Sequence, residues 1–100
     1  MGARTEVHTV DQPWPVVYDA FVQALPAAGF DVTSVDAARG RIDFERRNRR
    51  FTLAVGAIDT ITSEWIATSE QKFGVLPDRH ERQFAAIRDA LDRYLGTYYS

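Results

Sequence analysis

The fold is decided by residues 41–70, which read RIDFERRNRRFTLAVGAIDTITSEWIATSE. Apolar and polar side chains alternate along this stretch in three runs, which is the pattern of β-strands that are buried on one face. The first run is 41–47, the second begins at Phe51, and the third follows a turn at 59–60. Because that turn and the one near Asn48 are short, the three strands are expected to pair as an antiparallel meander.

The segments before this stretch predict a helix and two further strands. Residues 11–15 contain a helix start signal, in which Asp11 or Gln12 can supply the N-cap and the prolines are tolerated in the first helical turn. An apolar stripe at helical spacing follows, formed by Val17, Ala20, Phe21, Ala24, Leu25 and Ala28. Pro26 is expected to kink or end this helix, and Gly29 to close it. Residues 30–36 and, more weakly, 4–10 alternate as strands do.

The C-terminal segment predicts a second helix. Asp78 is expected to cap it and Gly96 to end it. Its apolar stripe is Phe84, Ile87, Leu91, Tyr94 and Leu95. The sequence therefore predicts a single domain, 1–100, of the α+β class with two layers. We expect an antiparallel sheet of four to five strands in the order β-α-β-β-β-β-α, with both helices on one face.

The composition excludes several kinds of protein. A chain with 45% hydrophobic and 26% charged residues is typical of a soluble globular domain. The absence of cysteine excludes disulfides and thiolate metal sites, and the net charge of −2 makes nucleic acid an unexpected partner. The longest apolar run is far below the roughly 20 residues of a membrane span. We expect a cytoplasmic protein, or one of the cell envelope if a leader peptide has been removed.

No group of residues predicts chemistry. His8 and His80 are the only histidines, and neither has a partner at metal-ligand spacing. The carboxylates mostly occupy outward positions, and no serine lies in a nucleophile motif. We therefore expect no catalytic residues, no metal and no cofactor, and interpret the chain as a protein that is not an enzyme.

The spacing of Trp14, Gly29-Phe30 and Gly40-Arg41-Ile42 resembles that of the small domains of BamC-type bacterial lipoproteins and of similar uncharacterised bacterial α+β domains. The resemblance implies a helix-grip fold, in which the sheet wraps around a long C-terminal helix. It also implies a protein-interaction module, and no catalytic residue carries over from it.

Three functions remain open. The main hypothesis is a non-enzymatic protein-interaction or structural module that binds a protein partner or a second copy as a homodimer. Its surface would be the apolar residues that the core leaves over, Ile58, Ile66, Phe73, Val75 and Leu76. The first alternative is a small apolar ligand in a cavity between the sheet and the C-terminal helix, lined by Phe44, Phe51, Trp65 and Phe84. The second is anion or nucleic-acid docking by the 46–50 hairpin, through Arg47, Arg49 and Arg50.

Overall fold

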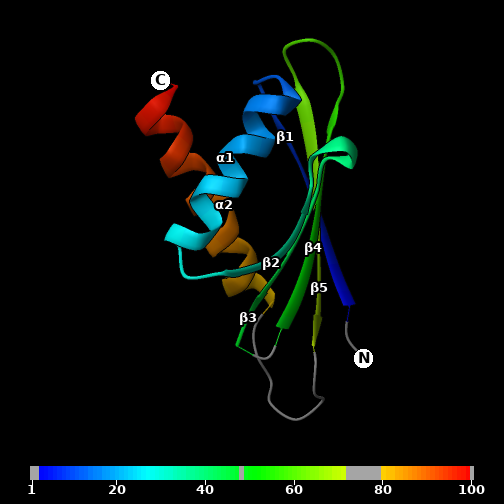
Figure 1. Cartoon of the computed structure of the whole chain (residues 1–100), viewed down its shortest axis with the longest axis vertical. Helices are drawn as coiled ribbons and strands as arrows, with labels where there is room; N and C mark the ends of the chain where they lie inside the picture. The colour runs from blue at the N-terminus through cyan, green and yellow to red at the C-terminus, as the bar shows by residue number, and fades with distance from the viewer. Residues whose placement is uncertain (1–2, 48, 72–79, 100) are drawn as a thin grey trace.

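The computed structural model describes residues 3–47, 49–71 and 80–99 of the 100-residue chain. The elements in chain order are β1 (Ala3–Val10), α1 (Trp14–Ala27), β2 (Asp31–Asp36), the short 3-10 helix η1 (Ala37–Arg39), β3 (Arg41–Arg46), β4 (Arg49–Ala57), β5 (Ser63–Gln71) and α2 (His80–Tyr98). The two helices form one layer and the sheet forms the other (Figure 1). The predicted fold class and element order are confirmed.

The sheet has five antiparallel strands in the order β1-β5-β4-β3-β2. The meander predicted from residues 41–70 forms its centre, where Phe44 pairs with Phe51 and Leu53 with Ala67. β1 forms one edge of the sheet and pairs along its length with β5. Because opposite residues of an antiparallel pair share a face, these pairings place one continuous apolar surface under the helices.

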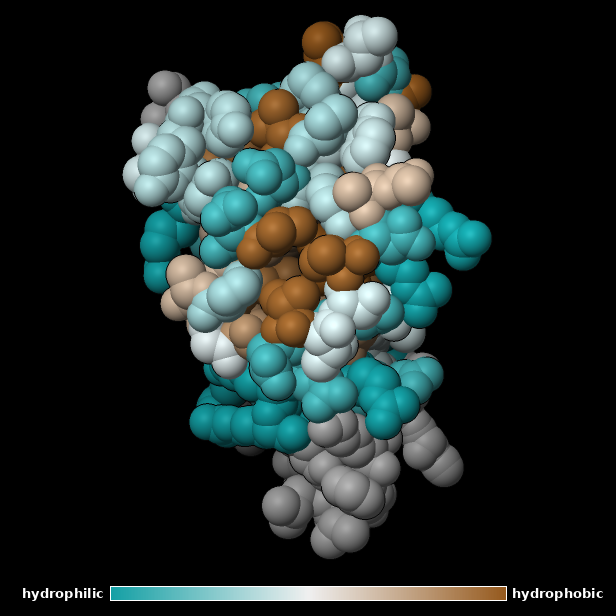
Figure 2. Space-filling view, in the orientation of Figure 1, coloured by the Kyte–Doolittle hydropathy of each residue, from teal (hydrophilic) through white to brown (hydrophobic). Residues whose placement is uncertain are grey.

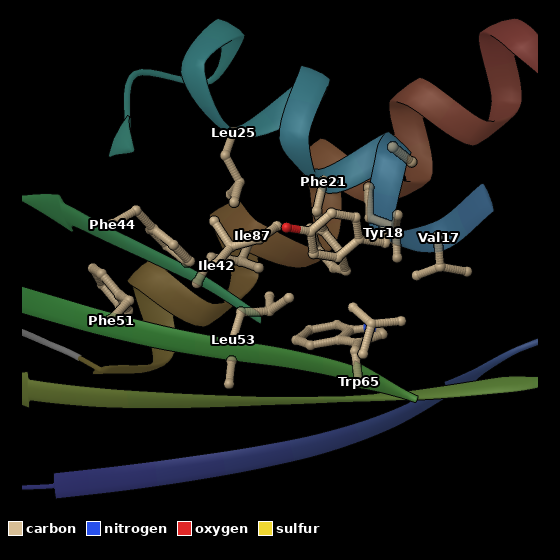
Figure 3. Close-up of a cluster of buried hydrophobic side chains, with 14 of the residues drawn as sticks. Val17, Tyr18, Phe21, Leu25, Ile42, Phe44, Phe51, Leu53, Trp65 and Ile87 are labelled. Carbon is tan, nitrogen blue, oxygen red and sulfur yellow. The ribbon is translucent and has the colours of Figure 1, made fainter. Parts of the chain in front are cut away.

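The core lies between the sheet and the helices and is rich in aromatic rings (Figure 3). Its buried members are Val17, Tyr18, Ala20, Phe21, Leu25, Phe30, Ile42, Phe44, Phe51, Leu53, Val55, Trp65, Ala67, Phe84, Ile87 and Leu91. The Phe21 ring meets Trp65 edge-on at 5.2 Å between centroids, and Phe44 stacks on Phe51 at 5.0 Å. The apolar stripes that the sequence predicts for the two helices supply the helix side of this core.

α1 begins differently from the expected pattern, but Gly29 closes it as expected. Its N-cap is Pro13 rather than Asp11 or Gln12, and no side chain caps it. Pro26 lies inside the last turn, where it does not end the helix at once, because the helix runs to Ala27. Gly29 then takes a φ of 94°, which lets the Phe30 amide donate to the carbonyl of Leu25 at 3.0 Å.

α2 continues past the predicted stop. Gly96 lies inside the helix, which ends at Tyr98. The two residues beyond Gly96 bring the Tyr98 ring to 4.6 Å from Tyr94, four residues earlier, and a pair of this kind offsets part of the helical cost of glycine. The predicted cap, Asp78, lies outside the described residues.

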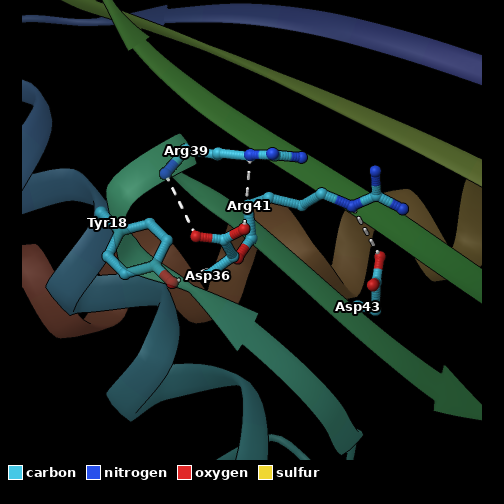
Figure 4. A network of polar contacts seen from close by, with 5 residues as sticks. All are labelled: Tyr18, Asp36, Arg39, Arg41 and Asp43. Atoms are coloured by element: carbon cyan, nitrogen blue, oxygen red, sulfur yellow. Dashed lines mark hydrogen bonds and ion pairs between the residues drawn. The ribbon is translucent and has the colours of Figure 1, made fainter.

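A polar network joins α1 to the β2–β3 connection (Figure 4). The Tyr18 hydroxyl donates to the carbonyl of Arg41 at 3.1 Å, and the Asp36 side chain accepts from the Arg39 amide at 3.4 Å. Burial raises the pKa of Tyr18, and the nearby charge of Asp36 also raises it. The hydrogen bond thus satisfies a hydroxyl that the core has largely removed from water.

The helices leave the outer part of β2 uncovered. Val35 pairs with Ile42, so it lies on the helix-facing side of the sheet, yet it is 55% exposed. Figure 2, which views the sheet nearly edge-on, shows hydrophobic side chains gathered in the middle of the molecule, where α1 approaches β2. The edge strand therefore adds apolar surface without contributing fully to the core.

Candidate functional site

An open groove of about 360 Å³ lies between α1 and α2. Its lining residues are Gln23, Ala24, Ala27 and Ala28 from α1 and its end, and Ala90, Arg93, Tyr94, Thr97 and Tyr98 from α2. Alanine dominates the α1 side, and because an alanine side chain ends at Cβ it leaves space beside the larger residues of α2. The groove is therefore a consequence of small residues facing large ones across the helix pair.

Tyrosine rings form the wall on the α2 side. Tyr94 contacts Tyr98 at 4.6 Å and Tyr99 at 6.4 Å between ring centroids. The Tyr94 side chain is half-buried, and desolvation raises the pKa of its phenol. The negative charge of Asp19, on α1, raises the pKa further, as do Tyr99 and Tyr98. A phenol has an ordinary pKa of about 10, so it is protonated near neutral pH with or without this shift.

The four aromatic residues predicted to line a pocket lie together elsewhere. Phe44, Phe51, Trp65 and Phe84 are each at most 2% exposed and belong to the core, so they line no opening to the surface. None of them lines the groove between the helices. The groove was missed from sequence. Its signal is the alanines at 24, 27 and 28, together with tyrosines four residues apart on the last helix.

The structure separates the three arginines predicted as an anion site. Arg47 occupies the turn with a φ of 57° and is exposed, whereas Arg50 points to the outer side of β4. Arg49 lies on the inner side and is only 1% exposed. Their separation follows from strand alternation, because Arg49 has the same phase as Phe51.

The residues predicted as a partner surface are also dispersed. Ile66 lies on the outer sheet face, opposite Val7 and Ala54 in the pairing, and Ile58 lies beyond the end of β4 in the connection to β5. Phe73, Val75 and Leu76 lie outside the described residues. Association with a second copy stays a prediction.

A titratable cluster links α2 to the edge strand β1. The Glu6 Oε1 atom accepts a hydrogen bond from Arg88 Nη1 at 2.8 Å and lies 2.8 Å from His8 Nε2. The His8 ring stacks on Trp65 with 4.5 Å between centroids. Since all three polar side chains are partly exposed, the cluster is an attachment of the helix to the sheet that water and salt can weaken.

We expect Glu6→Gln to lower the free energy of unfolding by no more than about 1 kcal/mol, because a partly exposed ion pair gains little over water. The loss should shrink at about 1 M salt, where the screening length falls to about 3 Å. Thermal unfolding at low and high salt measures this, with Asp89→Asn on the exposed side of α2 as the control. A loss that is equal at both salt concentrations would contradict the assigned ion pair.

The described residues hold neither a candidate metal cluster nor a membrane-spanning helix. They contain no group of three or more histidine, aspartate or glutamate side chains that could hold a metal ion. Neither helix, over those same residues, is long and apolar enough to cross a membrane.

Comparisons with known proteins identify the fold. No family model and no curated protein sequence matches the chain. The crystal structure of Ara h 8.0201 is similar with a TM-score of 0.65 and 10% identity, over 95% of this chain and 98% of that one. The di-domain ARO/CYC protein StfQ from the steffimycin biosynthetic pathway is similar with a TM-score of 0.58 and 12% identity. That match covers 88% of this chain and 43% of StfQ, so the chain spans less than half of StfQ.

These likenesses correct two predictions. They support the helix-grip part of the resemblance stated above, but not its BamC-type part. They also overturn the main hypothesis of a protein-interaction or structural module, because the structures that the chain resembles favour the alternative of a small apolar ligand. The chain has a helix-grip-like α+β fold.

Proposed function

We propose that this chain binds a small, largely apolar molecule, and that the groove between α1 and α2 holds it. The observation that carries the proposal is the groove itself, whose lining includes four alanines and two tyrosines. Small-molecule sites in proteins typically have volumes of about 300–1,000 Å³ and apolar walls with a few polar groups. The groove, at about 360 Å³, suits a ligand of one or two fused rings.

The fold supports the same function but suggests a different position. In this chain the space between the sheet and α2 is occupied by core rings, including Trp65 and the Phe44–Phe51 stack. Opening that space would expose side chains that stabilise the whole domain, which is costly. The groove offers apolar surface without that cost, and the ligand is therefore assigned to it.

In this proposal the groove binds its ligand and does not catalyse a reaction on it. The titratable side chains of the groove lining are Arg93, Tyr94 and Tyr98. A guanidinium stays charged, and the pKa of Tyr94 is raised, so neither group exchanges a proton readily near neutral pH. Efficient general acid–base catalysis needs a group that titrates near the working pH, and guanidinium and phenol groups do not.

Filling the groove tests the proposal. Ala27→Leu places a larger side chain in the groove at an exposed position, so the fold should tolerate it. We expect the variant to bind the neutral fluorescent probe N-phenylnaphthylamine at least about tenfold more weakly than the wild type, a difference of about 1.4 kcal/mol. Fluorescence titration measures the affinity.

The matched control is Ala54→Leu, the same substitution at an exposed position on the outer face of the sheet. It should leave the affinity unchanged. The absence of saturable binding to the wild type, or equal binding by Ala27→Leu, would refute the proposed site.

A further inference from the structure

We infer that β1 pairs with β1 of a second copy of this chain, in antiparallel orientation and around a two-fold axis at Val7. The two sheets then continue into each other edge to edge. This pairing goes beyond the proposed function, and the groove between α1 and α2 takes no part in it. Three features of the molecule support it: the open backbone of β1, the protected opposite edge of the sheet, and the self-complementary side chains of β1.

β1 offers a long backbone edge for pairing. Over the residues that the structure describes, β1 pairs along all eight residues with β5 and with no other strand. Because alternate residues of an antiparallel strand direct their N–H and C=O groups to the same neighbour, half of these groups in β1 point away from β5. Proline, lysine and register shifts commonly block the addition of a strand to such an edge. β1 contains none of them.

The opposite edge of the sheet is protected in ways that β1 is not. β2 forms that edge and is six residues long, and its pairing with β3 shifts register between Val32 and Ser34. It also begins and ends with an aspartate, at Asp31 and Asp36. Short length, an irregular register and charged residues all oppose strand addition at an edge. The edge that suits a second copy is therefore β1.

On the outer face, a two-fold axis at Val7 brings matching side chains together. Opposite residues of an antiparallel pair share a face, so Val7 would lie opposite Val7 of the second copy, and Thr5 opposite Thr9. Val7 is 54% exposed, and the residues beside it in the same row are Ile66 on β5 and Ala54 on β4. The pairing would extend this apolar row across the joint and cover part of each Val7 side chain.

On the inner face, the same register brings a carboxylate opposite an imidazole. Glu6 of each copy would lie opposite His8 of the other copy. Within one copy, the Glu6 Oε1 atom already lies 2.8 Å from His8 Nε2 and 2.8 Å from Arg88 Nη1. A register centred one residue earlier would instead place Glu6 opposite Glu6, which repulsion between like charges disfavours. The charges therefore favour the axis at Val7.

Cysteine cross-linking tests the pairing, because the chain has no cysteine of its own. Val7→Cys would place two thiols opposite each other, where Cα atoms of an antiparallel pair lie about 4.5–5.5 Å apart, a separation that a disulfide spans. The matched control is Val35→Cys, since Val35 is 55% exposed and lies on β2, at the other edge. Under oxidation by copper phenanthroline, Val7→Cys should form a covalent dimer at least about tenfold faster than Val35→Cys, because pairing raises the effective thiol concentration.

Sedimentation velocity of the cysteine-free protein measures the association itself. We expect a reversible dimer that dissociates on dilution, because the pairing of one strand is small beside a permanent interface. Val7→Lys should raise the dissociation constant at least about tenfold, since two like charges would face each other. Ala54→Lys adds the same charge at an exposed position on the outer face, on the central strand β4, and should leave the dissociation constant unchanged.

A wild-type protein that stays monomeric up to millimolar concentration would overturn the inference. Equal rates of cross-linking for Val7→Cys and Val35→Cys would do the same, because they indicate random collision. A dimer that Ala54→Lys disrupts and Val7→Lys retains would mean that two sheet faces pack together, which also contradicts pairing at the edge. Ligand binding in the groove is measured separately by the probe titration, so it can stand or fall independently of these results.

Discussion

Replacing Trp65 with alanine is expected to lower the free energy of unfolding by about 3–5 kcal/mol, the usual cost of removing a buried aromatic side chain. Trp65 is 2% exposed, lies on β5 between β1 and β4, and contacts both Phe21 and His8 through its ring. A small domain has a total stability of about 5–15 kcal/mol, so this variant should be close to unfolding at ambient temperature. Urea denaturation followed by circular dichroism measures the loss.

The neighbouring residue supplies the control. Ile66 follows Trp65 on β5 but points to the outer face, where it is 36% exposed. Ile66→Ala should therefore cost much less than Trp65→Ala, because most of the contacts that surround the ring are absent on that face. Similar losses for the two variants would mean that the helices do not cover the face on which Trp65 lies.

Gly40→Ala is expected to destabilise the protein by about 2–4 kcal/mol, from left-handed backbone strain and a displaced strand pairing. Gly40 has a φ of 64°, and an added Cβ would lie 2.3 Å from the carbonyl oxygen of Val55. At the same place the Val55 amide donates to the Gly40 carbonyl at 2.8 Å. The clash is with the backbone of Val55 and not with a flexible side chain, so the β3–β4 pairing itself would have to shift.

Substitutions at two other glycines separate the effect of backbone strain from the effect of the steric clash. Gly29 has a φ of 94° but open space around its Cβ position, so Gly29→Ala should show the strain alone. Gly56 has neither a positive φ nor a near neighbour, so Gly56→Ala should be close to neutral. Unfolding experiments on the three variants should rank Gly40 as the most sensitive and Gly56 as the least. A Gly40→Ala variant as stable as Gly56→Ala would contradict the observed close approach.

The sequence predicts the fold well because each element leaves a local pattern. Alternation along 41–70 places Ile42, Leu53 and Trp65 on one face, and a helical stripe does the same for Phe21 and Leu25. The prediction for Arg49 was wrong, although the alternation of β4 indicates a buried position. Arg49 shares the phase of the buried residues of β4, but a charged side chain in a hairpin was taken to be exposed.

The candidate site was less predictable because it depends on how two helices meet. Aromatic residues on inward positions, such as Phe44 and Phe84, can fill a core or line a cavity, and the pattern is the same in both cases. The groove arises where Ala24 and Ala27 face Tyr94 across the helix pair, and the pairing of helix faces is a tertiary feature. The position of Gly96 inside α2 likewise depends on ring contacts that no local signal reports.

Amide NMR of the labelled protein during titration with acetylnaphthalene tests the central claim most directly, because it reports where a ligand lies. The account predicts saturable shift changes centred on Ala24, Ala27, Tyr94 and Thr97, with the inner residues of β4 and β5 little affected. Changes centred on Phe51, Leu53 and Ala67 would place the ligand between the sheet and the helices and contradict the assignment to the groove. A spectrum that does not change would contradict ligand binding itself.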